Sequence, residues 1–109
     1  MRKLAGQTPH SFRMEKAEQA YSTPPVDVQI RPADISDANT IFAFLCDLEG
    51  VRLNQPAFNS IYAHNLSNPM VHYLVAVRGE EVVGFISCHV QWLLHHTGRV
   101  GEIQELYVR

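Results

Sequence analysis

Alternating apolar and polar residues mark the first regular element of the chain. From Val26 to Arg31 the two kinds of residue alternate with a period of two, and Pro32 follows. Successive side chains of a strand point to opposite faces, so this pattern predicts a half-buried strand. Proline has no N–H group to donate to a neighbouring strand, and we therefore expect the strand to end at Pro32.

Apolar residues at helical spacing then predict two helices. The expected buried face of the first consists of Ala38, Ile41, Phe42, Leu45 and Leu48. Either Ser36 or Asp37 is expected to cap its N-terminus, and Gly50 provides a stop at its C-terminus. The second helix is predicted to begin at Pro56, whose fixed φ suits a first turn, and to end at Asn68-Pro69. Its expected buried face consists of Phe58, Ile61, Tyr62 and Leu66.

Three further strands are predicted after the helices. They span Val71–Val77, Glu81–Trp92 and Val100–Val108. Gly79 can take the positive φ that the first tight turn requires, and residues 93–99 form the second connection. The expected fold is therefore of the α/β (α+β) class, in the order β-α-α-β-β-β, with a mainly antiparallel sheet and two helices.

Composition places this fold in one small domain. The 109 residues are 46% apolar and carry a net charge of −2. This charge does not indicate binding to nucleic acid or to an anionic membrane, which an excess of positive charge would favour. The two cysteines, Cys46 and Cys88, are expected to be buried free thiols, as in a reducing compartment. No apolar run approaches the roughly 18 residues that span a bilayer. We therefore expect a cytoplasmic protein without a membrane partner.

Residues 1–25 differ in character from the rest of the chain. They are polar and charged, and the segment Ser22-Thr23-Pro24-Pro25 is typical of a linker. We expect a disordered or weakly helical extension over residues 1–25 and a folded domain over 26–109. A true start of translation at Met14 or later is the alternative.

The last predicted strand contains two carboxylates in an otherwise apolar segment. A strict period of two places Glu102 on one face with Gln104, Leu106 and Val108, and Glu105 on the other with Ile103 and Tyr107. A carboxylate inside a sheet is desolvated, which favours a role as a general base. In the alternative, one or both carboxylates lie in solvent or pair with Arg99 or Arg109.

Histidines and arginines form the second group of candidate residues. His89, His95 and His96 could bind a metal or a substrate, because neutral imidazole is a common ligand. His95 and His96 are adjacent, so they bind one ion together only if they lie in a loop. Arg52 or Arg99 could grip a phosphonate with its guanidinium group. The alternatives are hydrogen-bonded or solvent-exposed side chains without a role in binding.

Four segments carry a resemblance to a known family. They are Asn65-Leu66-Ser67-Asn68-Pro69, Gly79-Glu80-Glu81-Val82-Val83-Gly84, the run from His89 to His96, and Gly101-Glu102-Ile103-Gln104-Glu105-Leu106. Over roughly residues 28–108 the chain resembles GNAT-superfamily N-acetyltransferases, and within them the aminoalkylphosphonate N-acetyltransferases. The double histidine followed by the Glu-Ile-Gln-Glu-Leu run is the specific part.

The resemblance implies a reaction and a set of roles. The expected reaction transfers acetyl from acetyl-CoA to a small primary amine such as an aminoalkylphosphonate. The resemblance implies that Glu102 is the catalytic glutamate, with Glu105 as the second candidate, and that the backbone of Leu106, Tyr107 and Val108 contacts the coenzyme. The candidate substrate-binding residues are His89, His95, His96 and Arg52. The enzymes resembled are metal-assisted, so a divalent metal is a further candidate cofactor.

The end of the sequence limits this expectation. Members of the family continue from the last strand into a glycine-rich loop that binds the coenzyme phosphates, whereas this sequence ends at Arg109. We therefore expect the N-terminal half of the fold, incomplete as an isolated enzyme. The alternative is a non-catalytic remnant that forms a homodimer through its exposed sheet. A ligand-binding or metal-binding module built on the histidines is a third hypothesis.

Overall fold

The computed structural model describes residues 27–109, so the expected extension over residues 1–25 lies outside the described part of the chain. Its elements follow the predicted order, with a short 3₁₀ turn added before the first helix and another before the last strand. They are β1 (Val28–Pro32), a 3₁₀ turn (Ile35–Asp37), α2 (Ala38–Glu49), α3 (Gln55–Leu66), β2 (Val71–Arg78), β3 (Glu81–Leu93), a 3₁₀ turn (Leu94–His96) and β4 (Gly98–Val108).

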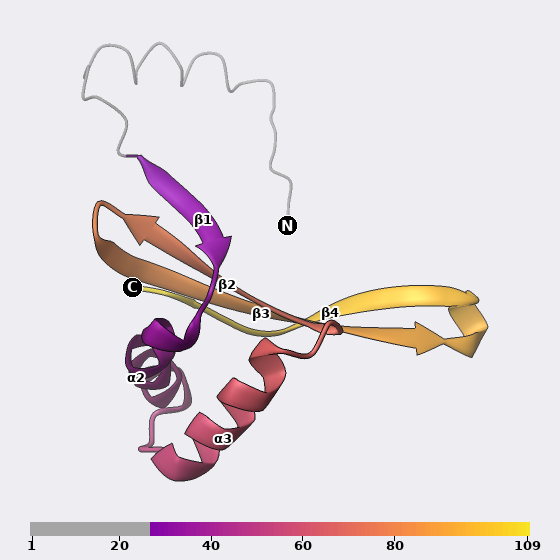
Figure 1. The fold of residues 1–109 in the computed structure, drawn as a ribbon, viewed down its shortest axis with the longest axis horizontal. Coiled ribbons are helices and arrows are strands. Elements are labelled where there is room, and N and C mark those ends of the chain that lie inside the picture. The colour runs from indigo at the N-terminus through magenta and orange to yellow at the C-terminus, as the bar shows by residue number, and fades with distance from the viewer. Residues whose placement is uncertain (1–26) are drawn as a thin grey trace.

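The four strands form one antiparallel sheet in the order β1-β2-β3-β4. Both helices lie on the same side of this sheet, and the hairpin of β3 and β4 extends beyond them (Figure 1). The predicted fold class and element order are therefore confirmed. The hairpin is longer than expected, because pairing continues as far as Leu93 and Gly98. None of the helices between residues 27 and 109 is long and apolar enough to cross a membrane.

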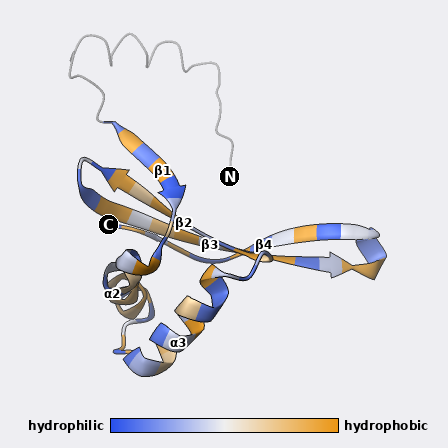
Figure 2. Ribbon diagram, in the orientation of Figure 1, coloured by the Kyte–Doolittle hydropathy of each residue, from blue (hydrophilic) through white to orange (hydrophobic). Residues whose placement is uncertain are grey.

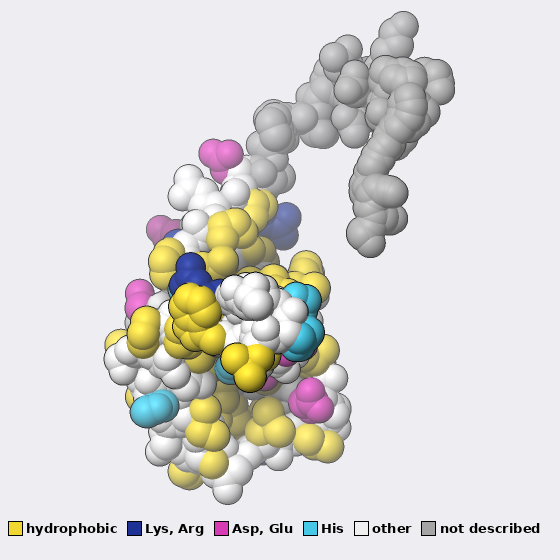
Figure 3. Space-filling model, turned by 90° about the vertical axis from the view of Figure 1, so that its right-hand side faces the viewer, with side chains coloured by type: hydrophobic (Ala, Val, Ile, Leu, Met, Phe, Trp, Pro, Cys, Tyr) yellow, Lys and Arg dark blue, Asp and Glu magenta, His cyan; other side chains and the backbone are white. Residues whose placement is uncertain are grey.

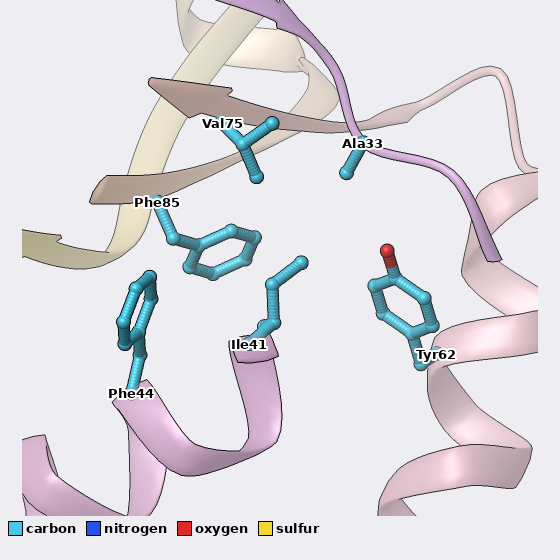
Figure 4. Close-up of a cluster of buried hydrophobic side chains, with 6 residues drawn as sticks. All are labelled: Ala33, Ile41, Phe44, Tyr62, Val75 and Phe85. Atoms are coloured by element: carbon cyan, nitrogen blue, oxygen red, sulfur yellow. The ribbon is translucent and has the colours of Figure 1, made fainter. Parts of the chain in front are cut away.

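The hydrophobic core lies where the two helices meet the sheet. Its buried residues come from both layers and are Ala33, Ile41, Phe44, Tyr62, Val75 and Phe85 (Figure 4). Ile41 and Val75 are 0% and 1% exposed. Full burial of one such aliphatic side chain stabilises the fold by about 1.5–3 kcal/mol. These contacts hold α2 and α3 against one face of the sheet.

Two residues of the predicted helical faces are exposed to solvent. Leu48 is 44% exposed, because the contacts of α2 with the core end at Leu45. Ile61 is 59% exposed and lines a cleft between the helices and the sheet. Both predictions of burial are wrong, although the helices themselves were predicted correctly.

The cap of the first helix also differs from the prediction. Asp34 caps the preceding 3₁₀ turn, and its carboxylate accepts the Ser36 N–H at 2.9 Å. Asp37 precedes α2, but its carboxylate accepts no hydrogen bond from the backbone of α2. It accepts instead from both terminal nitrogens of Arg31, at 2.8 and 2.9 Å, and from the Asp34 N–H at 2.8 Å. A bidentate ion pair is the stronger interaction, and here it joins β1 to the start of α2.

The second face of the sheet carries no helix within residues 27–109. Apolar residues recur along its strands (Figure 2). Ile30, Ile103, Leu106 and Val108 are 63%, 54%, 57% and 73% exposed. The two helices thus cover only one of the two faces of the sheet.

Candidate active site

A β-bulge in β4 determines where its carboxylates lie. Ser87 of β3 is opposite Glu105, and the next pair is Cys88 opposite Ile103. Gln104 is therefore an extra residue without a partner of its own. Such a bulge changes which residues of a strand share a face.

The bulge brings Glu102 and Glu105 to the same face of the sheet. Glu102 is opposite His89, and His89 shares its face with Ser87, the partner of Glu105. A Cβ atom placed on Gly101 would lie 3.1 Å from Cys88 Sγ, which places Gly101 on the other face. The prediction that Glu102 and Glu105 lie on opposite faces is therefore wrong. A strict period of two fails here because the extra residue shifts the alternation.

Glu105 lies in the cleft beneath the two helices. The cleft has a volume of about 320 Å³ and is lined by Ile41, Leu45, Leu53, Asn54, Ala57, Phe58, Ile61, Tyr62, Tyr73, Phe85 and Glu105. Glu105 is the one carboxylate in this lining and is half-buried. The Ser87 hydroxyl donates a hydrogen bond to Glu105 Oε1, and the Glu105 N–H donates to Ser87 Oγ at 3.0 Å. A mostly apolar cleft thus holds a single, fixed negative charge.

Two tyrosines on the cleft wall stay in their neutral form. Burial raises the pKa of Tyr73, and the nearby charge of Glu105 raises it further. The Tyr73 hydroxyl accepts from Asn65 Nδ2 at 2.8 Å. Burial likewise raises the pKa of Tyr62, whose hydroxyl donates to the Asp34 carbonyl at 2.6 Å. The negative charge of Glu105 therefore acts on the neutral hydroxyl of Tyr73.

Glu102 and His89 lie further along the same face. Glu102 is exposed and accepts a hydrogen bond from Gln104 Nε2 at 3.1 Å. His89 is half-buried, and its ring centroid lies 6.4 Å from that of Tyr73. Of the five histidine and carboxylate candidates, His89, Glu102 and Glu105 thus share one side of the sheet.

His95 and His96 occupy the far end of the β3–β4 hairpin. They form an exposed 3₁₀ turn with ring centroids 4.3 Å apart. Leu93, the last residue of β3, lies four positions after His89, which is about 13 Å at strand spacing. Histidine and hydrophobic side chains are visible together at this end of the molecule (Figure 3). The fold therefore separates the histidine pair from His89.

A metal site is not assembled in the described part of the chain. Within residues 27–109 no group of three or more His, Cys, Asp or Glu side chains is close enough to hold an ion. The two cysteines are free thiols, as predicted, and both are half-buried. The histidines thus do not form a common set of ligands.

Arg52 lies outside the cleft. Its guanidinium carbon is 5.3 Å from the centre of the Phe42 ring, and Nη2 donates to Gln55 Oε1 at 3.2 Å. Among residues 27–109, those that line the cleft include no lysine or arginine. Arg99 lies on the hairpin, 5.7 Å from the centre of the Trp92 ring.

The end of β4 presents backbone groups at the edge of the sheet. The Arg109 N–H donates to the Val83 carbonyl at 2.8 Å, and backbone groups of an antiparallel strand point to the partner at every second residue. Tyr107 therefore pairs with β3, whereas the N–H and C=O groups of Leu106 and Val108 point outward. No strand between residues 27 and 109 pairs with this outer edge. The Tyr107 side chain stacks on Phe44 with centroids 4.6 Å apart, and its hydroxyl donates to Asp47.

Three residues of the site were missed from the sequence. Ser87 is hydrogen-bonded to Glu105, Tyr73 lines the cleft, and Asn65 donates to the Tyr73 hydroxyl, yet each lies in an ordinary strand or helix pattern. Only the cross-strand register reveals Ser87, and that register depends on the bulge.

Sequence comparisons identify proteins with the same pattern. Residues 35–109 match the model of the Acetyltransferase (GNAT) family. The aminoalkylphosphonate N-acetyltransferase of Salmonella typhimurium strain LT2 is 45% identical over 80 residues, which cover 73% of this chain and 52% of that protein. The chain thus spans about half the length of this curated relative.

Solved structures that include acetyltransferases have the same fold. A possible acetyltransferase from Clostridium difficile 630 superposes with a TM-score of 0.64 at 27% identity, over 77% of this chain and 58% of that one. A predicted acetyltransferase from Clostridium acetobutylicum, solved with acetyl-CoA, gives 0.61 at 17% identity, over 76% and 60% of the two chains. At that identity the second match concerns the fold alone.

Proposed function

Because the chain belongs to the GNAT acetyltransferase family, we propose that it takes part in transferring an acetyl group from acetyl-CoA to a small primary amine. When bound, acetyl-CoA supplies an activated thioester. The tasks left to the protein are to bind the amine, to accept its proton and to align the two reactants.

The observation that carries this proposal is the carboxylate in the apolar cleft. Glu105 is half-buried, is held by Ser87 and, among residues 27–109, is the one charged group that lines the cleft. A protonated amine entering the cleft would find its counter-charge there. Because the surroundings are apolar, this attraction would be stronger than the same contact in water. Glu105 can then accept the proton that the amine must lose before it attacks.

Glu102 is the second candidate for proton acceptance. It lies on the same face as Glu105, opposite His89, and is exposed to solvent. A carboxylate in this position can accept a proton through water instead of by direct contact. We propose that Glu105 contacts the amine and that Glu102 receives protons leaving the site.

The backbone edge of β4 fits the acyl donor. The pantetheine arm of acetyl-CoA contains amide groups that pair with a strand as another strand would. The outward N–H and C=O groups of Leu106 and Val108 offer hydrogen-bond donors and acceptors to such amide groups. We propose this edge as the place where the arm is held. Tyr107 would contribute through packing on Phe44 because its backbone groups face β3.

An aminoalkylphosphonate is the acceptor that the relative suggests. The protein that shares 45% identity over 80 residues is named for acetylating this class of compound. A phosphonate is an anion, and its binding is favoured by side chains that donate N–H hydrogen bonds. The proposed contacts from this half of the domain are Arg52, at the α2–α3 loop, and His89, beside Glu102. His95 and His96 would reach a substrate only if it extended to the hairpin end.

A panel of amines tests the proposal. The chain is incubated with acetyl-CoA and either 2-aminoethylphosphonate, propylamine or ethanolamine, and the products are identified by mass spectrometry. We expect N-acetylated 2-aminoethylphosphonate to form fastest. Acetylation of propylamine at an equal rate would refute the phosphonate assignment, and no acetylated product with any amine would refute catalysis by this chain.

Self-association through the sheet is a second proposal, favoured by the exposed apolar face. Ile30, Leu106 and Val108 are all more than half exposed on strands of that face. Burying such a surface in a homodimer would remove it from water, which stabilises the association.

A further inference from the structure

Ser87 is the most deeply buried polar side chain among residues 27–109. Its exposed fraction is 0%, and it lies in the middle of β3 on the face covered by the helices. A buried hydroxyl without hydrogen-bond partners destabilises a fold, so such groups are nearly always paired. The partners of Ser87 therefore indicate its role.

Both hydrogen bonds of the Ser87 hydroxyl go to one residue. Its oxygen accepts from the Glu105 N–H at 3.0 Å, and its proton is donated to Glu105 Oε1. The β3–β4 register shifts immediately after Ser87. The hydroxyl thus serves as the acceptor for a backbone amide at the bulge while it also holds the carboxylate.

We propose that Ser87 is a positioning residue that fixes the Glu105 carboxylate in the cleft. Holding a residue at its amide and at its side chain leaves few of its rotamers accessible. The hydrogen bond occupies Oε1, which leaves Oε2 available to the amine. This role in catalysis rests on the proposed function of Glu105, whereas the double hydrogen bond is independent of it.

Amide hydrogen exchange tests the double hydrogen bond without any turnover. It is measured by NMR at the Glu105 amide in the unaltered chain and in Ser87→Ala, Ser87→Thr and Ser60→Ala. Ser60 is an exposed serine of α3 and serves as the control. Relative to the Tyr107 amide on the same strand, exchange at Glu105 should be about tenfold or more faster in Ser87→Ala and unchanged in Ser60→Ala. Unchanged protection in Ser87→Ala would overturn the proposal.

The threonine variant separates the hydroxyl from the size of the side chain. It keeps the oxygen, so Glu105 should remain protected if the variant folds. If its extra methyl group prevents folding, Ser87→Cys replaces it, because a thiol adds no branch at Cβ and is a weak donor and acceptor. The Glu105 amide should then exchange faster than in the unaltered chain. Equal protection of this amide in Ser87→Cys and in the unaltered chain would contradict a role for the hydroxyl.

Steady-state kinetics test the positioning role. For acetyl transfer to 2-aminoethylphosphonate, Ser87→Ala should lower kcat about 10- to 100-fold while KM for acetyl-CoA stays within about threefold. Ser87→Thr should restore most of kcat. If Ser87→Ala lowers the fraction of folded protein but leaves kcat per folded molecule unchanged, Ser87 has a purely structural role. If the unaltered chain shows no turnover, the proposed function fails, and the exchange measurement still decides whether Ser87 holds Glu105.

Discussion

Glu102 and Glu105 project from the same face of β4, although their spacing in a regular strand would put them on opposite faces. The extra residue at Gln104 produces this arrangement, and Gln104 also donates a hydrogen bond to Glu102. One bulge thus places both carboxylates on the side of the sheet that the helices cover. Only Glu105 reaches the cleft.

Glutamine substitutions should separate the roles of the two carboxylates. Glu105→Gln keeps the size of the side chain and removes the charge that faces the amine, so kcat/KM for the amine should fall about 100- to 10,000-fold. Glu102→Gln should cause a smaller loss, because Glu102 is exposed and water can replace it. Initial rates of acetylated product measure both effects.

If kcat/KM for the amine falls further in Glu102→Gln than in Glu105→Gln, the roles assigned to the two carboxylates are reversed. Equal binding of acetyl-CoA to both variants, measured by calorimetry, would exclude disruption of the β4 edge as the cause of either loss.

Asp37 should contribute strongly to stability. It is 4% exposed and binds Arg31 and the Asp34 amide, so Asp37→Ala leaves both groups without this partner. We expect the free energy of unfolding to fall by about 2 kcal/mol, less than the roughly 3–5 kcal/mol of a fully buried pair, because water screens the partly exposed Arg31. Urea denaturation measures this change. Asp27→Ala, at an exposed carboxylate, is the control and should change little.

The same ion pair predicts how stability depends on pH. The hydrogen bonds from Arg31 lower the pKa of Asp37, so Asp37 stabilises the fold fully above the pKa of the unfolded chain, near 4. This contribution should be lost as the pH falls from about 4 through the lower pKa of the folded state. Asp37 raises the pKa of Arg31, which stays charged over this range. The difference in unfolding free energy between the unaltered chain and Asp37→Asn should therefore shrink below pH 4, and an equal difference at pH 2 and pH 7 would contradict the assignment.

Two tyrosine hydroxyls should differ in their effect on stability. Tyr62 is 2% exposed, and its hydroxyl donates to the Asp34 carbonyl at 2.6 Å. Tyr62→Phe should lower the free energy of unfolding by about 1 kcal/mol. Tyr107→Phe should have less effect, since its hydroxyl contacts the exposed Asp47. Thermal unfolding of the two variants compares them, and a greater loss in Tyr107→Phe would contradict this ranking.

A charge on the uncovered face should reduce self-association. Val108 is 73% exposed on that face, and Val51, 58% exposed in the α2–α3 connection, is the matched control. We expect Val108→Glu to shift the chain toward monomer in sedimentation equilibrium and Val51→Glu to have little effect. A monomeric unaltered chain would refute the homodimer proposal.

The sequence was sufficient to predict the elements of this fold. The alternation around Gln29 and the helical spacing of Ile41 and Leu45 reflect single periodicities within one element, and these patterns predicted the strand and helix observed. The β3–β4 hairpin was predicted for the same reason. Its extension to Leu93 was missed because pairing there depends on the partner strand.

The site was harder to predict because it depends on register. No residue type marks the bulge at Gln104, so the faces of Glu102 and Glu105 were assigned incorrectly, and the role of Ser87 did not emerge. The helix cap was also predicted incorrectly, because the Asp37 carboxylate binds Arg31 and the Asp34 N–H and so accepts no bond from the backbone of α2.

The most direct test of this account is the release of coenzyme A thiol from acetyl-CoA, measured with and without 2-aminoethylphosphonate for the unaltered chain and for Glu105→Gln. The account predicts release that depends on the amine in the unaltered chain and is at least about 100-fold slower in Glu105→Gln. Release that does not depend on the amine, or equal rates in the two proteins, would contradict it.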